Sequence, residues 1–211
     1  PTPVIGMVGL IEDLKKTISQ AWVNKNDQIW LLGIPLDTLD PLYEKVSLGA
    51  TSYLENILNL QTGRPPLIDL EFEKLVQLFL RQSISNDLIK SAHDISDGGL
   101  VIALAESCIS SGLGVNCNIP ICENRIDKIL FGEGGSRILI SISTENEERF
   151  KLALQTFNQK NNSFVSANCI GKVSDKDSLE IQRDNTLIID LPILEISNVF
   201  ENAIPKRIQS L

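Results

Sequence analysis

The sequence predicts an α/β protein in which helices pack on a mixed parallel and antiparallel sheet. Apolar runs of strand length alternate along the 211 residues with longer stretches that have helical spacing. Two of the strand-like runs are joined through Asp184-Asn185, which is typical of a hairpin turn. The hydrophobic content of 43% is enough for one sizeable core. This mixture of strands, helices and a hairpin favours a sandwich over a doubly wound parallel sheet.

The first half of the chain predicts five elements. The helix over 69–84 is the clearest, because its apolar residues from Phe72 to Leu80 recur at helical spacing and form one stripe. Residues 62–66 have the composition of a loop. The five elements, in order, are a strand over 4–10, a turn or short helix over 11–21, a buried strand over 29–34, a helical stretch over 40–60 interrupted at 49–52, and the helix over 69–84.

The second half predicts a similar alternation. The segment 100–110 is apolar nearly all round and should be a buried helix, which Ser-Gly-Leu-Gly at 111–114 stops in the manner of a glycine C-cap. Pro120 favours an edge position for the strand that it follows. The other elements are strands over 89–92, 115–121, 138–142, 165–173, 179–183 and 187–191, an amphipathic helix over 145–159, a last helix over 193–203 that ends before Pro205, and a frayed tail over 206–211.

Composition excludes several functional classes. Acidic residues outnumber basic ones 27 to 19 and no basic cluster occurs, so nucleic acid is not an expected partner. No apolar run reaches membrane-spanning length, and no signal peptide is recognisable. The four cysteines form no CxxC pair and there is one histidine, so a structural zinc site is not expected. We expect reduced thiols and a cytoplasmic location.

Residues 92–100, Ala-His-Asp-Ile-Ser-Asp-Gly-Gly-Leu, carry the most specific signal. They lead from a strand through two carboxylates and a glycine pair into a helix. Gly98 and Gly99 allow a close approach of the backbone, and the N–H groups of the new helix form an anion site. Asp94 and Asp97 could hold a divalent cation. The simpler alternative is that Ser96 or Asp97 caps the helix and the glycines only make the turn.

A second glycine-rich loop covers 131–137. Three glycines beside Glu133 and Arg137 could cradle a polar ligand, or they could form an ordinary turn. His93 is the only histidine and therefore the only candidate base of that kind, but its position in a strand-end turn favours a structural hydrogen-bonding role.

Residues 92–100 resemble the signature of the C-terminal domain in the aminoimidazole-ribonucleotide-synthetase superfamily. Residues 1–11, Gly-Arg-Pro-Pro at 63–66, Phe-Gly-Glu at 131–133 and Ala-Ile-Pro at 203–205 are similar, in the same order, to the phosphoribosylformylglycinamidine synthase family. This resemblance covers essentially the whole chain. It implies the α/β/α sandwich of the superfamily's C-terminal domain.

The resemblance implies an ATP-dependent C–N ligase of purine biosynthesis, which converts formylglycinamide ribonucleotide to formylglycinamidine ribonucleotide with magnesium and glutamine-derived ammonia. It implies that 1–25 are a strand and linker from a preceding domain and that 26–211 are the second C-terminal domain. The family's catalytic histidine lies upstream, so no catalytic residue is expected here and the chain alone should be inactive. The implied partners are the remaining synthase domains, a glutaminase subunit and a small accessory subunit.

The resemblance also implies an auxiliary nucleotide site, with Asp94 as its magnesium ligand. The chain departs from the family at 48–52, where Leu-Gly-Ala-Thr-Ser replaces the usual Leu-Gly-Gly-Ser-Glu, and at 134–135, where glycines replace more polar residues. Asp97 stands where glutamate is frequent. These departures weaken the case for a working site. The implied site residues are Asp94, Ser96, Asp97, Gly98, Gly99 and Glu133.

Two other interpretations stay open from the sequence. The domain could be a structural module that docks other subunits, in which case apolar residues near 4–10 should be exposed. It could also belong to another superfamily member, such as selenophosphate synthetase or thiamine-monophosphate kinase. The opening Pro-Thr-Pro and the Gly-Arg-Pro-Pro loop favour the synthase.

Overall fold

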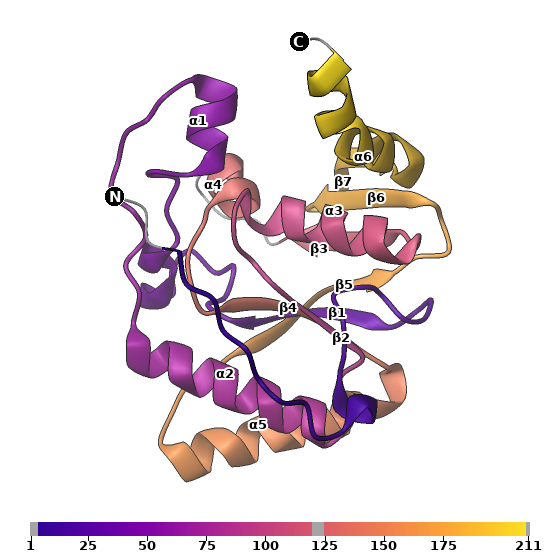
Figure 1. Ribbon diagram of the computed structural model, residues 1–211. Helices are drawn as coiled ribbons and strands as arrows, with labels where there is room; N and C mark the ends of the chain where they lie inside the picture. Colours follow the sequence, from indigo (N-terminus) through magenta and orange to yellow (C-terminus); the bar gives the residue numbers. More distant parts are fainter. Residues whose placement is uncertain (1–3, 120–124, 210–211) are drawn as a thin grey trace.

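The computed structural model describes residues 4–119 and 125–209. A seven-stranded sheet with the order β2-β4-β1-β5-β3-β6-β7 runs through the centre of the molecule (Figure 1). The strands are β1 (Gln28–Gly33), β2 (Ser91–Asp94), β3 (Val115–Ile119), β4 (Arg137–Ile142), β5 (Ala167–Val173), β6 (Ser178–Arg183) and β7 (Thr186–Pro192).

The sheet is mixed, as the sequence predicts. Strands β3 and β6 pair in parallel, and every other neighbouring pair is antiparallel. Strands β6 and β7 form the predicted hairpin, in which Asp184 and Asn185 both have a positive φ, of 49° and 58°. That backbone conformation matches the right-handed twist of the flanking strands.

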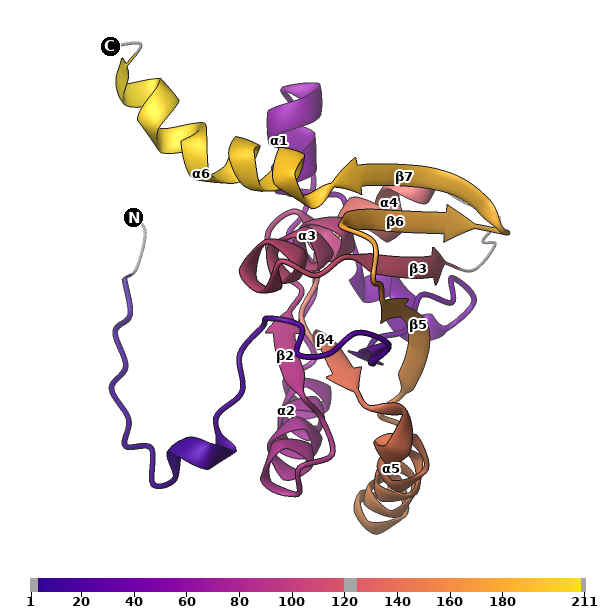
Figure 2. The same cartoon turned by 90° about the vertical axis from the view of Figure 1, so that its right-hand side faces the viewer.

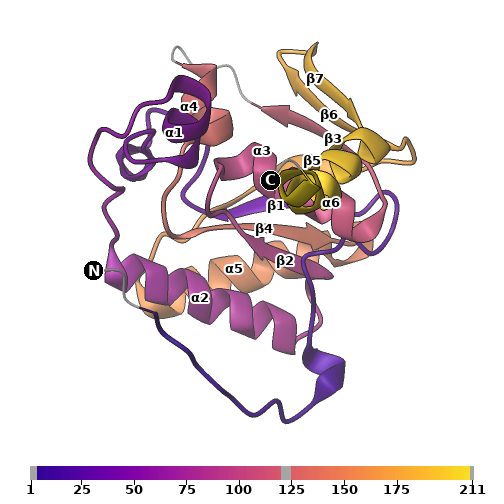
Figure 3. The same cartoon turned by 45° about the horizontal axis from the view of Figure 1, so that its top comes forward.

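Helices cover both faces of the sheet. Helices α2 and α5 lie on one face, whereas α3, α4 and α6 lie on the other (Figures 1 and 3). The α-helices are α1 (Ser52–Leu58), α2 (Leu70–Ser85), α3 (Gly99–Ser111), α4 (Ile126–Phe131), α5 (Glu147–Asn161) and α6 (Ile193–Gln209), and the 3-10 helices are η1 (Leu14–Lys16), η2 (Pro41–Lys45) and η3 (Thr144–Asn146). No described helix combines the length and apolar content that crossing a membrane requires.

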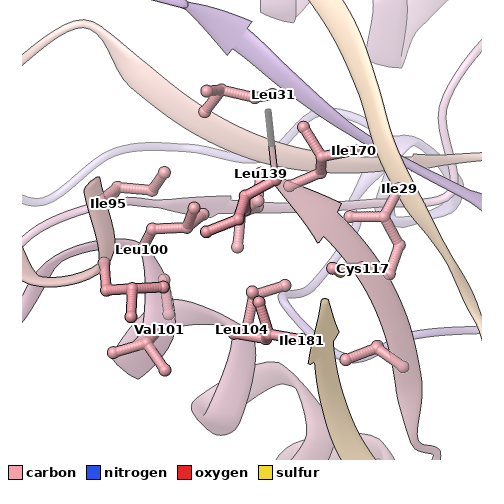
Figure 4. Packing of buried hydrophobic residues seen from close by; sticks show 14 of the residues in the cluster. Ile29, Leu31, Ile95, Leu100, Val101, Leu104, Cys117, Leu139, Ile170 and Ile181 are labelled. Carbon is pink, nitrogen blue, oxygen red and sulfur yellow. The ribbon is translucent and has the colours of Figure 1, made fainter. Parts of the chain in front are cut away.

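Strand β1 divides the core into two layers because its side chains alternate between the faces. Ile29 and Leu31 pack toward α3, where Leu100 and Leu104 meet them (Figure 4). Trp30 and Leu32 point the other way and join the aromatic residues of α2 and α5. Helix α2 has one apolar stripe because only one of its faces is covered. Helix α3 is apolar nearly all round because it is buried on most sides.

Several predicted boundaries are confirmed. Helix α2 starts one residue after Asp69, whose side chain accepts a hydrogen bond from the Phe72 amide as an N-cap. Helix α3 ends at Ser111, within the predicted 111–114 stop, and Gly112 adopts the left-handed conformation of a helix C-cap. The interrupted helical stretch over 40–60 consists of the two short helices η2 and α1.

The predicted edge position of β3 is wrong. This strand lies inside the sheet, between β5 and β6. It ends at Ile119, before the proline on which the prediction rested, so all of its own N–H groups remain available for pairing. The predicted extension over 120–121 lies outside the described residues.

The predicted N-terminal strand is not formed within the described residues. Residues 4–10 pair with no described strand and run clear of the sheet (Figure 2). The apolar side chains of this segment are almost fully exposed, from 82% at Ile5 to 104% at Val8. The sequence pattern correctly indicates a segment suited to burial, but the described part of the chain supplies no surface that covers it.

The last helix is longer than predicted. Helix α6 continues through Pro205 to Gln209, so residues 206–209 are helical and not a frayed tail. Proline removes one backbone donor and crowds the carbonyl one turn earlier, but an exposed helix end tolerates this because water can satisfy the freed carbonyl. Helix α4, which precedes the glycine-rich loop, was not predicted.

Candidate functional site

The diglycine turn connects β2 to α3 and makes the close backbone approach that the sequence predicts. Gly98 and Gly99 have φ values of 81° and 74°, which side-chain-bearing residues rarely adopt. A Cβ atom on Gly99 would lie 2.7 Å from the Phe131 carbonyl carbon and 2.8 Å from the Gly132 carbonyl oxygen. The partner of the turn is therefore the second glycine-rich loop, where Glu133 lies.

Glu133 joins the two predicted loops directly. Its Oε1 atom accepts one hydrogen bond from the Gly98 amide and another from the Ser52 amide, both at 2.9 Å. Its backbone also exchanges two hydrogen bonds with Ser47, each of 2.9 Å. Gly98 is the N-cap residue of α3, and Ser52 is the first residue of α1. One carboxylate oxygen thus satisfies backbone donors at the starts of two helices.

Asp94 lies at the end of β2 with 74% of its side chain exposed. Its Oδ2 accepts a hydrogen bond of 2.6 Å from the Ser96 hydroxyl. That bond, with smaller contributions from its own backbone and from His93, holds the pKa of Asp94 below its usual value against partial burial. Nε2 of His93 lies 2.8 Å from Glu106 on α3, and the structural role of the histidine stays a prediction.

A pocket of about 820 Å³ opens beside this turn, between α2, the end of β2 and the 131–137 loop. Among the described residues, its wall contains four carboxylates and one basic residue. Glu73 of α2 is fixed there by the Ser136 hydroxyl at 2.6 Å and by Gln77 at 2.7 Å. The charged lining residues are Glu73, Asp94, Asp97, Glu133 and Arg137.

Arg137 is 2% exposed, although it bears a charge. Its Nη1 donates to the Gly132 carbonyl at 3.0 Å, while its Nε and Nη2 have no hydrogen-bond partner among the described residues. Burial lowers the pKa of Arg137 to about 10, and the nearby Tyr43 phenol acts in the opposite direction. The guanidinium supports the loop from inside, next to Glu133.

The arrangement of the described residues does not test the magnesium prediction for Asp94. Among residues 4–119 and 125–209, no three His, Cys, Asp or Glu side chains are grouped so that they could hold a metal ion. Magnesium often uses only one or two carboxylates and takes its other ligands from water and substrate phosphates. Asp94 as a ligand therefore remains a prediction, and so does nucleotide contact by the six implied residues.

Of those six residues, four line the pocket, namely Asp94, Ser96, Asp97 and Glu133. No local sequence pattern marks Glu73, which lies beside the apolar stripe of α2, or the Ser52 amide, which is a backbone donor. Glu133 and Gly98 were both predicted site residues, but their contact with each other was not predicted.

Comparisons with known proteins agree with this fold. The model of the family "AIR synthase related protein, C-terminal domain" matches residues 26–184. Two curated relatives from Prochlorococcus marinus are named phosphoribosylformylglycinamidine synthase subunit PurL. The one from strain SARG / CCMP1375 is 59% identical over 100% of this chain and 26% of its own length, and the one from strain NATL1A is 45% identical over 99% and 26%. The chain thus spans about a quarter of these relatives.

Solved structures from Thermotoga maritima share the fold. PurL complexed with FGAR has a TM-score of 0.62 and 16% identity, over 87% of this chain and 30% of that one. PurL complexed with ATP has a TM-score of 0.61 and 14% identity, over 87% and 28%. The family model matches residues 26–184, which make up most of the chain. The chain therefore belongs to the AIR synthase related protein C-terminal domain family.

Proposed function

We propose that this chain serves as the last domain of a phosphoribosylformylglycinamidine synthase. That enzyme converts formylglycinamide ribonucleotide to formylglycinamidine ribonucleotide with ATP, magnesium and glutamine-derived ammonia. The observation that carries the proposal is the 59% identity to a relative of that name over the whole length of this chain. Both P. marinus relatives bear the same name, which favours the synthase over selenophosphate synthetase or thiamine-monophosphate kinase.

In this proposal, residues 1–25 are the strand and linker from the preceding domain, and residues 26–211 are the C-terminal domain. The parent enzyme uses ATP and magnesium, an assignment supported by the T. maritima PurL structures complexed with ATP and AMPPCP. Amide activation needs a site that stabilises developing phosphate charge. We assign that chemistry to the rest of the enzyme, because the resemblance places the family's catalytic histidine upstream of this chain.

A chimaeric synthase that carries this chain in place of its own last domain tests the proposal directly. This chain should replace the corresponding quarter of the relative from P. marinus strain SARG and leave a chimaera that forms product from formylglycinamide ribonucleotide, ATP, magnesium and ammonia. The purified 211-residue chain should form none in the same assay, because it lacks the reactive groups. Turnover by the isolated chain, or a folded chimaera without activity, would refute the proposal.

We further propose that the exposed N-terminal segment docks against the remaining domains of the synthase. Val4, Met7 and Val8 are each at least 92% exposed, and burial of such side chains is favourable by roughly 1.5–3 kcal/mol each. The glutaminase and the small accessory subunit are the other proposed partners. A cytoplasmic location is part of this proposal, and the free thiols of Cys108, Cys117 and Cys169 support it.

Two substitutions test the docking. Met7→Ser with Val8→Ser should lower the activity of the chimaera by about tenfold or more, since two apolar contacts are lost. The same pair should leave the thermal stability of the isolated chain unchanged, because both side chains are exposed there. Glu12→Ser, in the same exposed segment, is the control and should affect neither measurement. An unaffected double variant would argue against docking through this segment.

A further inference from the structure

The start of α3 has the features of an anion site, but a side chain of the protein already fills it. Gly98 and Gly99 bring no side chain to the turn, and the positive end of a 13-residue helix points at it. The N-cap residue is a glycine, so it makes no side-chain cap of its own. In its place, Oε1 of Glu133 lies 2.9 Å from the Gly98 nitrogen.

We infer that Glu133 is a built-in anion that takes the position of a ligand phosphate at this turn. The same oxygen accepts the Ser52 amide at the start of α1, so the carboxylate faces the positive ends of two helices at once. Two further contacts fix the Glu133 segment in place. Its backbone pairs with Ser47, and the neighbouring Phe131 ring stacks on Tyr53 of α1 at a centroid distance of 4.6 Å.

The negative charge of the pocket wall also opposes the binding of a phosphate. Besides Glu133, the carboxylates of Glu73, Asp94 and Asp97 line the pocket, and the one basic residue that lines it in the described part of the chain is the buried Arg137. A free phosphate in the pocket would be repelled by these three carboxylates as well as by Glu133. The turn is a structural joint between α1, α3 and the 131–137 loop.

A phosphate could bind at the turn only by displacing Glu133. Displacement would leave the Ser52 amide without its acceptor and would break the bridge between the starts of α1 and α3. Phosphate binding at the turn and this carboxylate bridge are thus mutually exclusive in this domain. This inference concerns the 211-residue chain itself, so its test is separate from the synthase assay.

NMR titration of the purified, ¹⁵N-labelled chain tests the inference, with inorganic pyrophosphate and with Mg-ATP as probes. In the wild type, the amide resonances of Gly98 and Gly99 should show no saturable shift at millimolar probe. In Glu133→Ala both resonances should shift saturably with pyrophosphate, because the donors are freed. Glu145→Ala removes an exposed carboxylate elsewhere and should behave like the wild type.

Glu133→Gln keeps the shape of the side chain and removes its charge, so it preserves the test if the alanine variant does not fold. We expect its Gly98 resonance to respond to pyrophosphate more weakly than that of Glu133→Ala but more strongly than that of the wild type. Saturable shifts at Gly98 and Gly99 in the wild type would overturn the inference. Folded Glu133 variants that ignore pyrophosphate would overturn it as well.

Discussion

Gly99→Ala should lower the free energy of unfolding by about 2–5 kcal/mol, the sum of two separate costs. The left-handed backbone at φ 74° costs roughly 1–2 kcal/mol for an alanine. The new Cβ would also lie within 2.8 Å of the Gly132 carbonyl oxygen, and overpacking of this kind typically costs about 1–3 kcal/mol. The contacted atoms are backbone, which cannot move aside as the end of a flexible side chain can. Urea unfolding followed by circular dichroism measures the change.

Gly112→Ala separates the two costs. Gly112 has a similar φ of 69°, but a Cβ there would have no atom within 4 Å. Its replacement should therefore cost only the backbone strain, roughly 1–2 kcal/mol. If both variants lose the same stability, the backbone of the diglycine turn does not press against the 131–133 segment.

Arg137→Ala should lower the free energy of unfolding by about 3 kcal/mol, whereas Arg137→Met should change it by less than about 1 kcal/mol. Alanine leaves a cavity at one of the largest fully buried side chains and releases the Gly132 carbonyl. Methionine also loses that hydrogen bond, but it fills the volume and removes a charge that is poorly compensated, since Nε and Nη2 lack partners among the described residues. The two effects should nearly cancel.

The comparison of the two Arg137 variants is made by urea unfolding at neutral pH, where the arginine is charged. Equal losses in both would mean that the guanidinium charge itself stabilises the fold, which contradicts the expected cancellation. Equal m-values in the three proteins would show that the change lies in stability and not in the compactness of the unfolded state.

Local patterns predicted most of the fold. The apolar stripe of α2, the buried run of α3 and the turn at Asp184-Asn185 each reflect a constraint within a few residues, and each is found as expected. The errors arose where the outcome depends on distant partners. The interior position of β3 is set by its pairing with β5 and β6, and the exposure of residues 4–10 is set by the absence of a covering surface among the described residues.

The candidate site was predicted only in part, because it too depends on contacts between residues that are far apart in the sequence. The motif at 92–100 correctly indicated a close backbone approach and a donor at Gly98, and the second loop supplied Glu133. No sequence pattern stated that these two loops would meet each other, because 35 residues separate the atoms of that hydrogen bond. The sequence therefore indicated the chemistry of an anion site, whereas the structure identifies the anion that lies there.

Amide hydrogen exchange at Ser52 and Gly98 tests the central claim most directly, namely that the Glu133 carboxylate ties the starts of α1 and α3 together. In Glu133→Ala, both amides should exchange about tenfold faster than in the wild type, relative to the core amide of Ile140, because each loses its acceptor. Unchanged relative exchange at both positions would contradict the claim.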